Sequence, residues 1–211
     1  MSHESDRAAI VEVCRRLYEK GLVTANEGNI SVRVQDGHLV TAAGVSKGAL
    51  TVEQVLFVDD EGKQASGCPA VSSEDKMHAA IYRSRKDVQA IIHAHPPTAT
   101  AFAVAHLPID ARILAESVVV LGAVPLIPYA TPGTAELANL VARDLKDGHA
   151  ALLANHGAVA VGATLAQAHQ RMETLEQVAR VALMARLLGG ARELSTEDCD
   201  RLLGLEAARY R

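Results

Sequence analysis

Tryptophan is absent from this sequence of 211 residues, and aromatic residues make up only 3% of it. So few aromatic rings provide no row of platforms on which nucleic-acid bases could stack. The formal net charge of −4 gives no overall attraction to nucleic acid or to an anionic membrane. We therefore expect neither a nucleic acid nor a membrane as a partner, and any anionic ligand must be held by a local site.

Cysteine is also scarce, and the three cysteines, Cys14, Cys68 and Cys199, lie far apart along the chain. Their spacing predicts neither a disulfide framework nor a thiolate zinc site. The longest apolar run, residues 118–130, contains two prolines and is too short to span a bilayer. The start, MSHESDRAAI, lacks the apolar core of a signal peptide. We expect a protein of the reducing cytoplasm.

Hydrophobic spacing predicts helices and strands in alternation. Apolar residues three and four apart predict helices around 10–17, 74–83, 98–105, 134–146 and 164–188, with a further helix opening at Ser195. Alternating or continuous apolar runs predict strands at 30–34, 38–41, 55–58, 88–93, 118–127, 151–154 and 159–161. Hairpins mixed with crossover helices imply a single α/β domain over residues 1–211, with helices on both faces of a sheet.

Two histidines end one of the predicted buried strands, in the stretch His93-Ala94-His95. Side chains two apart on a strand point to the same face, so both imidazoles can reach one metal ion. The prolines that follow end the strand and place the pair at its terminus. Taken alone, the pattern is equally consistent with two hydrogen-bonded histidines at a strand edge.

Two further polar residues favour the metal interpretation. His156 lies between two apolar strands, where an imidazole needs a partner, and Gly157 beside it permits a close backbone approach. Glu74 begins a predicted helix behind the N-cap candidates Ser72 and Ser73. Taken singly, His156 fits a structural turn and Glu74 fits simple helix capping. Together, three imidazoles suit zinc and leave a position for substrate, while a nearby carboxylate can act as a base.

A substrate phosphate would need its own site. Backbone amides and hydroxyls are available at Gly28-Asn29, at Gly44 and at Ser72-Ser73, the last pair at a helix N-terminus. Each glycine alone is also consistent with a simple turn. Lys47 could add charge, although a lone lysine in a loop is usually a solvated surface residue.

Five short stretches, taken together, are similar to the class II aldolase family, which also contains the adducin head domains. They occur in the family's order and spacing: residues 24–31 (TANEGNIS), 72–74 (SSE), 93–95 (HAH), 128–131 (PYAT) and 155–157 (NHG). The similarity runs from the first predicted helix to the C-terminal tail. It implies a three-layer α/β/α fold with a mostly antiparallel central sheet. It also implies a cyclic homotetramer with active sites between neighbouring subunits.

The resemblance assigns roles to individual residues. His93, His95 and His156 match the family's zinc ligands, with manganese or cobalt as alternative metals. Glu74 matches the carboxylate that binds the zinc and transfers the proton. The positions of the family's phosphate pocket are matched by Gly28, Asn29, Gly44, Ser72 and Ser73. The implied activity is zinc-dependent cleavage of a phosphorylated ketose to dihydroxyacetone phosphate and an aldehyde.

Some positions depart from the family pattern. Ala43 stands before Gly44 where the family usually has threonine, so one hydroxyl of the phosphate pocket is missing. Leu114 lies near the position of a tyrosine that protonates the leaving aldehyde, and Glu116 is an alternative donor. Tyr210 matches a second tyrosine of the family's mobile tail, and a simple tail aromatic is the alternative. These departures favour 5-deoxyribulose 1-phosphate or 5-methylthioribulose 1-phosphate over fuculose 1-phosphate.

Other activities share the same metal ligands. A dehydratase, a decarboxylase or an epimerase of a sugar phosphate is an alternative within the superfamily. The epimerase type carries aspartate after the paired serines, whereas this chain carries Glu74. A non-catalytic adducin-like interaction module is a further alternative, and it predicts a broken metal site.

Overall fold

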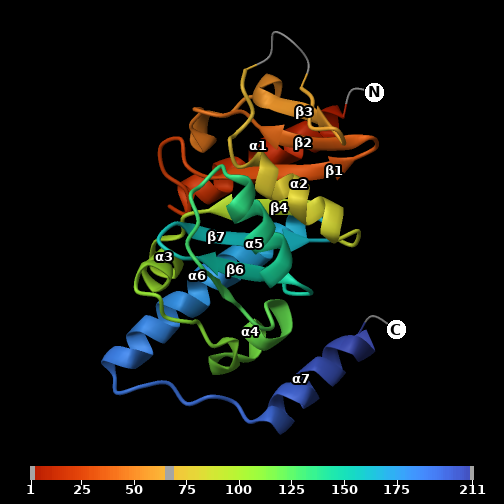
Figure 1. The fold of residues 1–211 in the computed structure, drawn as a ribbon. Helices are drawn as coiled ribbons and strands as arrows, with labels where there is room; N and C mark the ends of the chain where they lie inside the picture. The colour runs from red at the N-terminus through yellow and green to blue at the C-terminus, as the bar shows by residue number, and fades with distance from the viewer. Residues whose placement is uncertain (1–2, 65–68, 210–211) are drawn as a thin grey trace.

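The computed structural model describes residues 3–64 and 69–209. Within them, seven strands form one sheet in the order β3-β2-β1-β4-β7-β6-β5 (Figure 1). The strands are β1 (Asn29–Val34), β2 (Gly37–Thr41), β3 (Val55–Asp59), β4 (Ala90–Ala94), β5 (Leu126–Ile127), β6 (Ala150–Leu153) and β7 (Gly157–Gly162). Neighbouring strands are antiparallel except for the parallel pair β5 and β6. The predicted mostly antiparallel sheet is confirmed.

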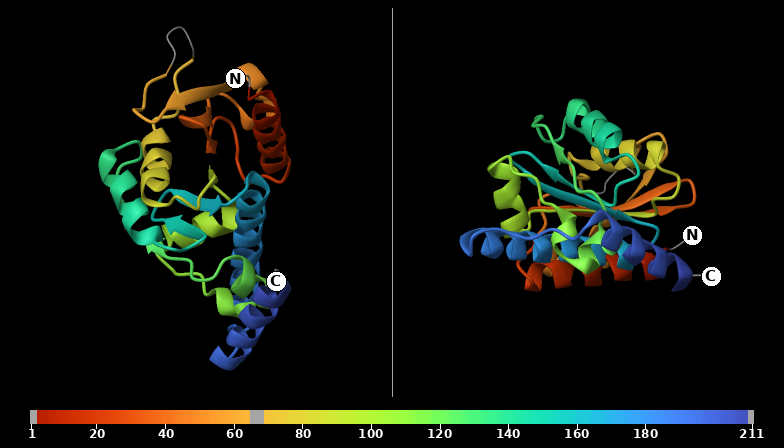
Figure 2. Two further views of the ribbon diagram at one scale, coloured as in Figure 1. Left: turned by 90° about the vertical axis from the view of Figure 1, so that its right-hand side faces the viewer. Right: turned by 90° about the horizontal axis from the view of Figure 1, so that it is seen from below.

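Helices cover both faces of this sheet (Figure 2). In chain order they are α1 (Glu4–Glu19), α2 (Asp75–Ser84), α3 (Pro97–Val104), α4 (Ala115–Val120), α5 (Ala135–Leu145), α6 (Leu165–Leu187) and α7 (Thr196–Arg209). Short 3-10 turns occur at Lys47–Ala49, Val52–Gln54 and Ala111–Ile113. Helices α2 and α5 pack on one face, and α1, α3 and α6 pack on the other. This is the three-layer α/β/α arrangement that was predicted.

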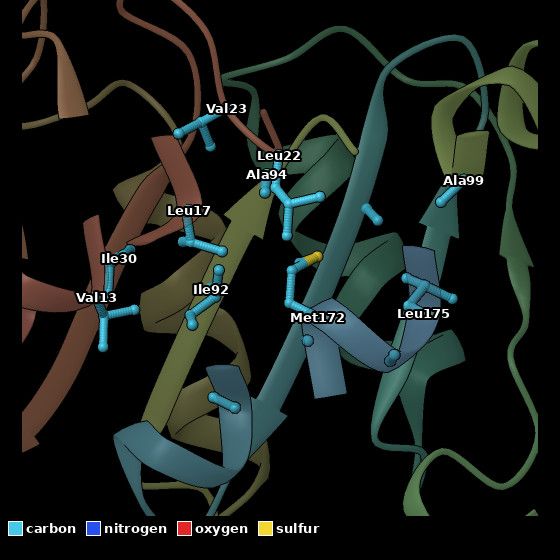
Figure 3. Close-up of a cluster of buried hydrophobic side chains, with 14 of the residues drawn as sticks. Val13, Leu17, Leu22, Val23, Ile30, Ile92, Ala94, Ala99, Met172 and Leu175 are labelled. Carbon is cyan, nitrogen blue, oxygen red and sulfur yellow. The ribbon is translucent and has the colours of Figure 1, made fainter. Parts of the chain in front are cut away.

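The alternation of side chains along β4 divides the apolar core between the two faces. Ile92 belongs to the cluster beneath α1 and α6, which contains Leu17 and Met172 (Figure 3). Ile91 belongs to the second cluster, beneath α2 and α5. Because strand side chains repeat every two residues, His93 shares the face of Ile91 and projects toward the start of α2. The strand period therefore aims this histidine at Glu74.

Two of the helices begin at the threonines that their sequence predicts. The Thr134 hydroxyl accepts a hydrogen bond from the Leu137 amide at 3.3 Å, at the start of α5. The Thr164 hydroxyl accepts one from the Gln167 amide at 3.1 Å, at the start of α6. Each such cap contributes about 1 kcal/mol of helix stability. Together they fix where α5 and α6 leave the sheet.

The prediction of a strand over residues 118–127 is wrong. Its first part is the helix α4, and only its end forms the short strand β5. The Ser117 hydroxyl donates to the Leu114 carbonyl oxygen at 2.8 Å, and Gly122 ends the helical region with a φ of +60°. A run of valines predicts a strand because β-branched residues favour extended backbone. Here the packing of α4 against α6 and α7 outweighs that local preference.

In the part of the chain that is described, no helix is long and apolar enough to cross a membrane.

Candidate metal centre

Three histidines converge at one end of the central strands. His93 lies in β4, His95 follows the end of that strand, and His156 lies in the turn between β6 and β7. Their ring centroids are 4.7 to 5.1 Å apart. One nitrogen from each ring lies within 4.8 Å of the other two. The structure therefore brings together all three histidines that the sequence singles out.

The hydrogen bonding of His93 leaves its other nitrogen free for a metal. Nδ1 donates to the Ala158 carbonyl oxygen at 2.9 Å, so Nε2 presents a lone pair. That lone pair faces the His95 Nε2 at 3.1 Å and the Glu74 Oε2 at 3.2 Å. Ligand atoms about 2.0–2.1 Å from a tetrahedral zinc ion lie about 3.3 Å apart. These separations fit one divalent ion. A cation would also offset the repulsion between the lone pairs that converge here.

Glu74 completes the cluster from the start of α2. The helix starts at Asp75 with Glu74 as its N-cap residue, so the predicted serine cap is displaced by one or two residues. The Glu74 side chain makes no capping bond and instead places Oε1 3.2 Å from Nε2 of His156. Its Oε2 accepts a hydrogen bond from Nδ2 of Asn29 at 3.0 Å. Oε1 is buried without a hydrogen-bond partner, which fits a carboxylate oxygen placed for a cation.

Burial and neighbouring charges set the protonation of these groups. Burial raises the pKa of the Glu74 carboxyl, but the nearby His93 and His156 rings and the Asn29 hydrogen bond together hold it well below its usual range. Burial, followed by the neighbouring His93 ring, lowers the pKa of His156 to about 4. The same two causes lower the pKa of His95. At neutral pH the cluster thus offers an ionised carboxylate and unprotonated His95 and His156 rings, which are the forms that bind metals.

The turn that carries His156 depends on a close backbone contact. Asn155 has a φ of +54°, and its Oδ1 accepts a hydrogen bond from Nε2 of His106 at 2.7 Å. Gly157 lies so close to the end of β4 that an added Cβ would be 2.5 Å from Cδ2 of His95 and 2.7 Å from the Ala94 carbonyl oxygen. The glycine is therefore needed for close approach, while the left-handed backbone is at Asn155.

Replacing Gly157 with alanine is expected to push the His95 ring out of the cluster. Part of the obstruction is backbone, so the added methyl group cannot be accommodated by a rotamer change alone. We expect the affinity for zinc to fall about 10- to 100-fold, as when the support of a metal ligand is lost. Zinc titration against a fluorescent chelator measures this. Gly204→Ala is the matched control, because nothing lies within 4 Å of the added Cβ. Equal zinc affinity in both variants would contradict the contact.

The predicted phosphate-binding residues line a pocket of about 240 Å³ beside the histidines. It contains all five predicted positions together with His95 and Glu74, and the five are Gly28, Asn29, Gly44, Ser72 and Ser73. The Ser72 hydroxyl oxygen accepts hydrogen bonds from Nδ2 of Asn29 at 3.1 Å and from the Glu74 amide at 3.3 Å. An added Cβ on Gly28 would lie 2.7 Å from the His93 carbonyl oxygen, which explains the glycine there. The metal cluster and the predicted anion pocket are therefore continuous.

Glu27 belongs to this site but was not predicted from the sequence. The Glu27 Oε2 accepts a hydrogen bond from the Thr24 hydroxyl at 2.8 Å and lies 3.6 Å from Nδ1 of His95. A carboxylate behind the outer nitrogen of a ligand histidine orients the ring and raises its basicity. The only signal was that Glu27 lies two residues before Asn29 in the same short stretch.

Two other predicted residues, Leu114 and Glu116, are not brought to the cluster within this chain. Leu114 and Glu116 line a different cleft, together with Lys20 and Glu176. Tyr210 lies outside the described residues.

Acidification is expected to destabilise the metal-free protein. The pKa values of His156 and of the fully buried His78 fall from 6.5 to about 4 and about 3, mainly through burial. Between pH 6.5 and these values the unfolded chain binds protons that the folded chain does not, so stability is lost as the pH falls through this window. Melting temperatures of the chelated protein at about pH 7.5 and about pH 5 measure the loss. His78→Asn should reduce the difference, and equal melting temperatures of the wild type would contradict it.

The chain is similar to several known proteins. Residues 8–183 match the family model described as class II aldolase and adducin N-terminal domain. An L-fuculose phosphate aldolase from Escherichia coli O6:H1 is 37% identical, over 82% of this chain and 80% of the relative. A 5-methylthioribulose-1-phosphate/5-deoxyribulose-1-phosphate aldolase from Escherichia coli O45:K1 is 35% identical, over 74% of this chain and 73% of the relative. A solved structure of an L-fuculose 1-phosphate aldolase superposes with a TM-score of 0.89 at 29% identity, covering 95% of both chains.

Proposed function

Because the chain belongs to the family of class II aldolases and adducin N-terminal domains, we propose that it is a metal-dependent aldolase of phosphorylated ketoses. Its products are dihydroxyacetone phosphate and an aldehyde. The observation that supports this most directly is the convergence of three histidine nitrogens and the Glu74 carboxylate beside a small pocket rich in hydroxyl and amide groups. An adducin-like module without catalysis has no need of such a cluster.

His93, His95 and His156 would hold the metal, and Glu74 would be the fourth ligand while substrate is absent. When bound, a divalent ion such as zinc polarises the carbonyl and hydroxyl oxygens of a ketose. Imidazole nitrogens suit zinc, and the added carboxylate is also compatible with manganese or cobalt.

Glu74 is the residue placed to move the proton at carbon. In the synthetic direction its ionised carboxylate removes a proton from the carbon beside the carbonyl of dihydroxyacetone phosphate, and in cleavage it returns one. The Asn29 amide holds one carboxylate oxygen at 3.0 Å and thereby fixes the direction of the other. Ser72, Ser73 and Gly44 line the same pocket as Glu74 and would hold the phosphate.

Two departures from the family pattern and one relative support a proposal for the substrate class. Ala43 has no hydroxyl, and Leu114 is apolar where a tyrosine is expected. Because Leu114 lies in a different cleft of its own chain, it would reach the active site of a neighbouring subunit in the tetramer proposed below. A ketose phosphate with a deoxy or thioether end fits an apolar residue better than fuculose 1-phosphate does. We therefore propose 5-deoxyribulose 1-phosphate or 5-methylthioribulose 1-phosphate as the better substrate. One relative at 35% identity bears the name of an aldolase of these two compounds.

A coupled assay for dihydroxyacetone phosphate release tests the proposal. The purified protein is given fuculose 1-phosphate, 5-deoxyribulose 1-phosphate and 5-methylthioribulose 1-phosphate, with and without chelator. Chelator-sensitive release is the expected result, and the order of the rates identifies the substrate class. Release of water from methylthioribulose 1-phosphate, or of carbon dioxide from a sugar-acid phosphate, would instead favour the dehydratase or decarboxylase alternatives.

We also propose a homotetramer with active sites between subunits. The end of α6 and the helix α7 expose apolar side chains that a partner subunit would cover, namely Leu183, Met184, Leu187, Leu188, Leu203 and Leu205. Light scattering coupled to size-exclusion chromatography measures the mass of the assembly, and a monomer would contradict this part of the proposal.

A further inference from the structure

Lys47 is buried although its sequence position predicts a solvated loop residue. It starts a 3-10 turn after β2, and only 2% of the residue is exposed. Its Nζ donates to the Val45 carbonyl oxygen at 2.9 Å and to the Asn26 carbonyl oxygen at 3.4 Å. An ammonium group has three N–H donors, so one remains available. Lysine is almost never this buried unless a charged partner is present.

The charge of Lys47 has no counter-ion in the described part of the chain. Both hydrogen-bond acceptors of Nζ are neutral carbonyl oxygens, and no ion pair to Nζ forms among residues 3–64 and 69–209. Burial accordingly lowers the pKa of the ammonium group. Taking an ammonium group out of water costs several kcal/mol unless an opposite charge offsets it. A buried cation of this kind fits a site where the opposite charge arrives with a ligand.

The position of Lys47 points to an anion in the predicted phosphate pocket. It lines the pocket of about 240 Å³ that also contains Gly44, Ser72 and Ser73. Its two carbonyl partners are Asn26, three residues before Asn29, and Val45, directly after Gly44, so Nζ bonds both segments that carry pocket residues. The other charged residues that line this pocket are the carboxylates Glu27 and Glu74. Among the described residues that line this pocket, Lys47 is thus the sole lysine or arginine, and the nearby hydroxyl and amide donors are neutral.

We propose that Lys47 is the cation of the phosphate subsite and binds the phosphate dianion of the substrate directly. The inference rests on the proposed function for the identity of the phosphate ester, while the subsite itself is testable with inorganic phosphate. Ala43 leaves the pocket one hydroxyl short, and the ammonium group supplies a charged donor in place of a neutral one. A charge-assisted hydrogen bond is about twice as strong as a neutral one. The same positive charge offsets the repulsion between the phosphate and Glu74.

Lys47→Gln is the test, because glutamine keeps a donor for the carbonyl oxygens and removes the charge. The dissociation constant of inorganic phosphate is measured by calorimetry on the zinc-loaded protein, at low and at high salt. We expect phosphate to bind about 10- to 100-fold more weakly to Lys47→Gln than to wild type. The salt dependence of binding should also decrease. Lys47→Arg should retain most of the affinity, and Lys63→Met, which removes a lysine side chain that is 74% exposed, should bind as wild type does.

Zinc content and melting temperature of the same variants distinguish a loss of the Lys47 charge from a change in the structure of the site. Loss of phosphate binding with unchanged zinc content and melting temperature supports the subsite. Equal phosphate affinity in wild type and Lys47→Gln overturns it. A parallel fall in zinc content, melting temperature and phosphate affinity, not rescued by Lys47→Arg, overturns it too, because Lys47 would then only join the two segments. Phosphate binding that depends on Lys47 in a protein without aldolase activity would refute the proposed function and leave this inference standing.

Discussion

Replacing His95 with alanine is expected to remove the metal and to lower the rate of dihydroxyacetone phosphate release at least about 1,000-fold. The side chain supplies one of three nitrogens that lie within 4.8 Å of one another. With only two imidazoles left, the Lewis-acid contribution of several kcal/mol to the transition state is lost. Metal content by plasma emission spectroscopy and turnover in the coupled assay measure both effects.

The fold itself should survive this substitution. His95 follows the end of β4 and is partly exposed, so its removal leaves no large cavity in either apolar core. His169→Ala is the matched control, because His169 pairs with Glu173 on α6, away from the cluster. The control should keep one metal per chain and normal turnover. Normal turnover by His95→Ala would refute the assignment of the site.

Replacing Glu74 with glutamine is expected to lower turnover about 100- to 10,000-fold while the metal is retained. Glutamine has nearly the same shape and can still accept the hydrogen bond from Asn29. The three histidines remain, so zinc binding persists, but a neutral amide cannot remove a proton from carbon. This combination separates the proton-transfer step from metal binding, which His95→Ala cannot do.

Hydrogen exchange gives the most direct readout of Glu74. Wild-type protein in deuterated water should exchange one carbon-bound hydrogen of dihydroxyacetone phosphate without any aldehyde present, which nuclear magnetic resonance detects. Glu74→Gln should abolish the exchange. Glu136→Gln, an exposed carboxylate in the first turn of α5, should exchange at the wild-type rate. Unimpaired exchange by Glu74→Gln would show that another group is the base.

The histidine cluster was predictable because two of its members obey a short-range rule. His93 and His95 follow the two-residue period of a strand, and the prolines after them mark its end. His156 and Glu74 obey no such spacing. They reach the cluster because β7 pairs with β4 and α2 starts beside β1, and periodicity alone does not specify those pairings. Their local contexts made both residues candidates, and similarity to a known family assigned them to the metal site.

The burial of Lys47 and the helical conformation of α4 could not be predicted from the sequence. Lys47 stands in a loop between two strands, where a lysine is expected to be solvated, yet it is buried and bonded to the segments around Asn26 and Val45. The helix α4 was missed for the opposite reason, since its valines follow the local preference for strands. In both cases tertiary contacts between distant segments decide the outcome, and local propensity is a weak guide to such contacts.

The register of the central strands has a consequence for how the chain folds. Asn29 pairs directly with His93 across β1 and β4, and His93 pairs with Val159 across β4 and β7. The groups at the cluster come from segments far apart in sequence, so they meet only after these slow, long-range pairings have formed. A metal ion that binds only the fully assembled cluster stabilises the native state. It does not stabilise partly folded states in which the cluster has not yet formed. Metal loading should therefore lower the rate of unfolding and leave the rate of folding nearly unchanged. The bound ion would in this way give the sheet kinetic stability.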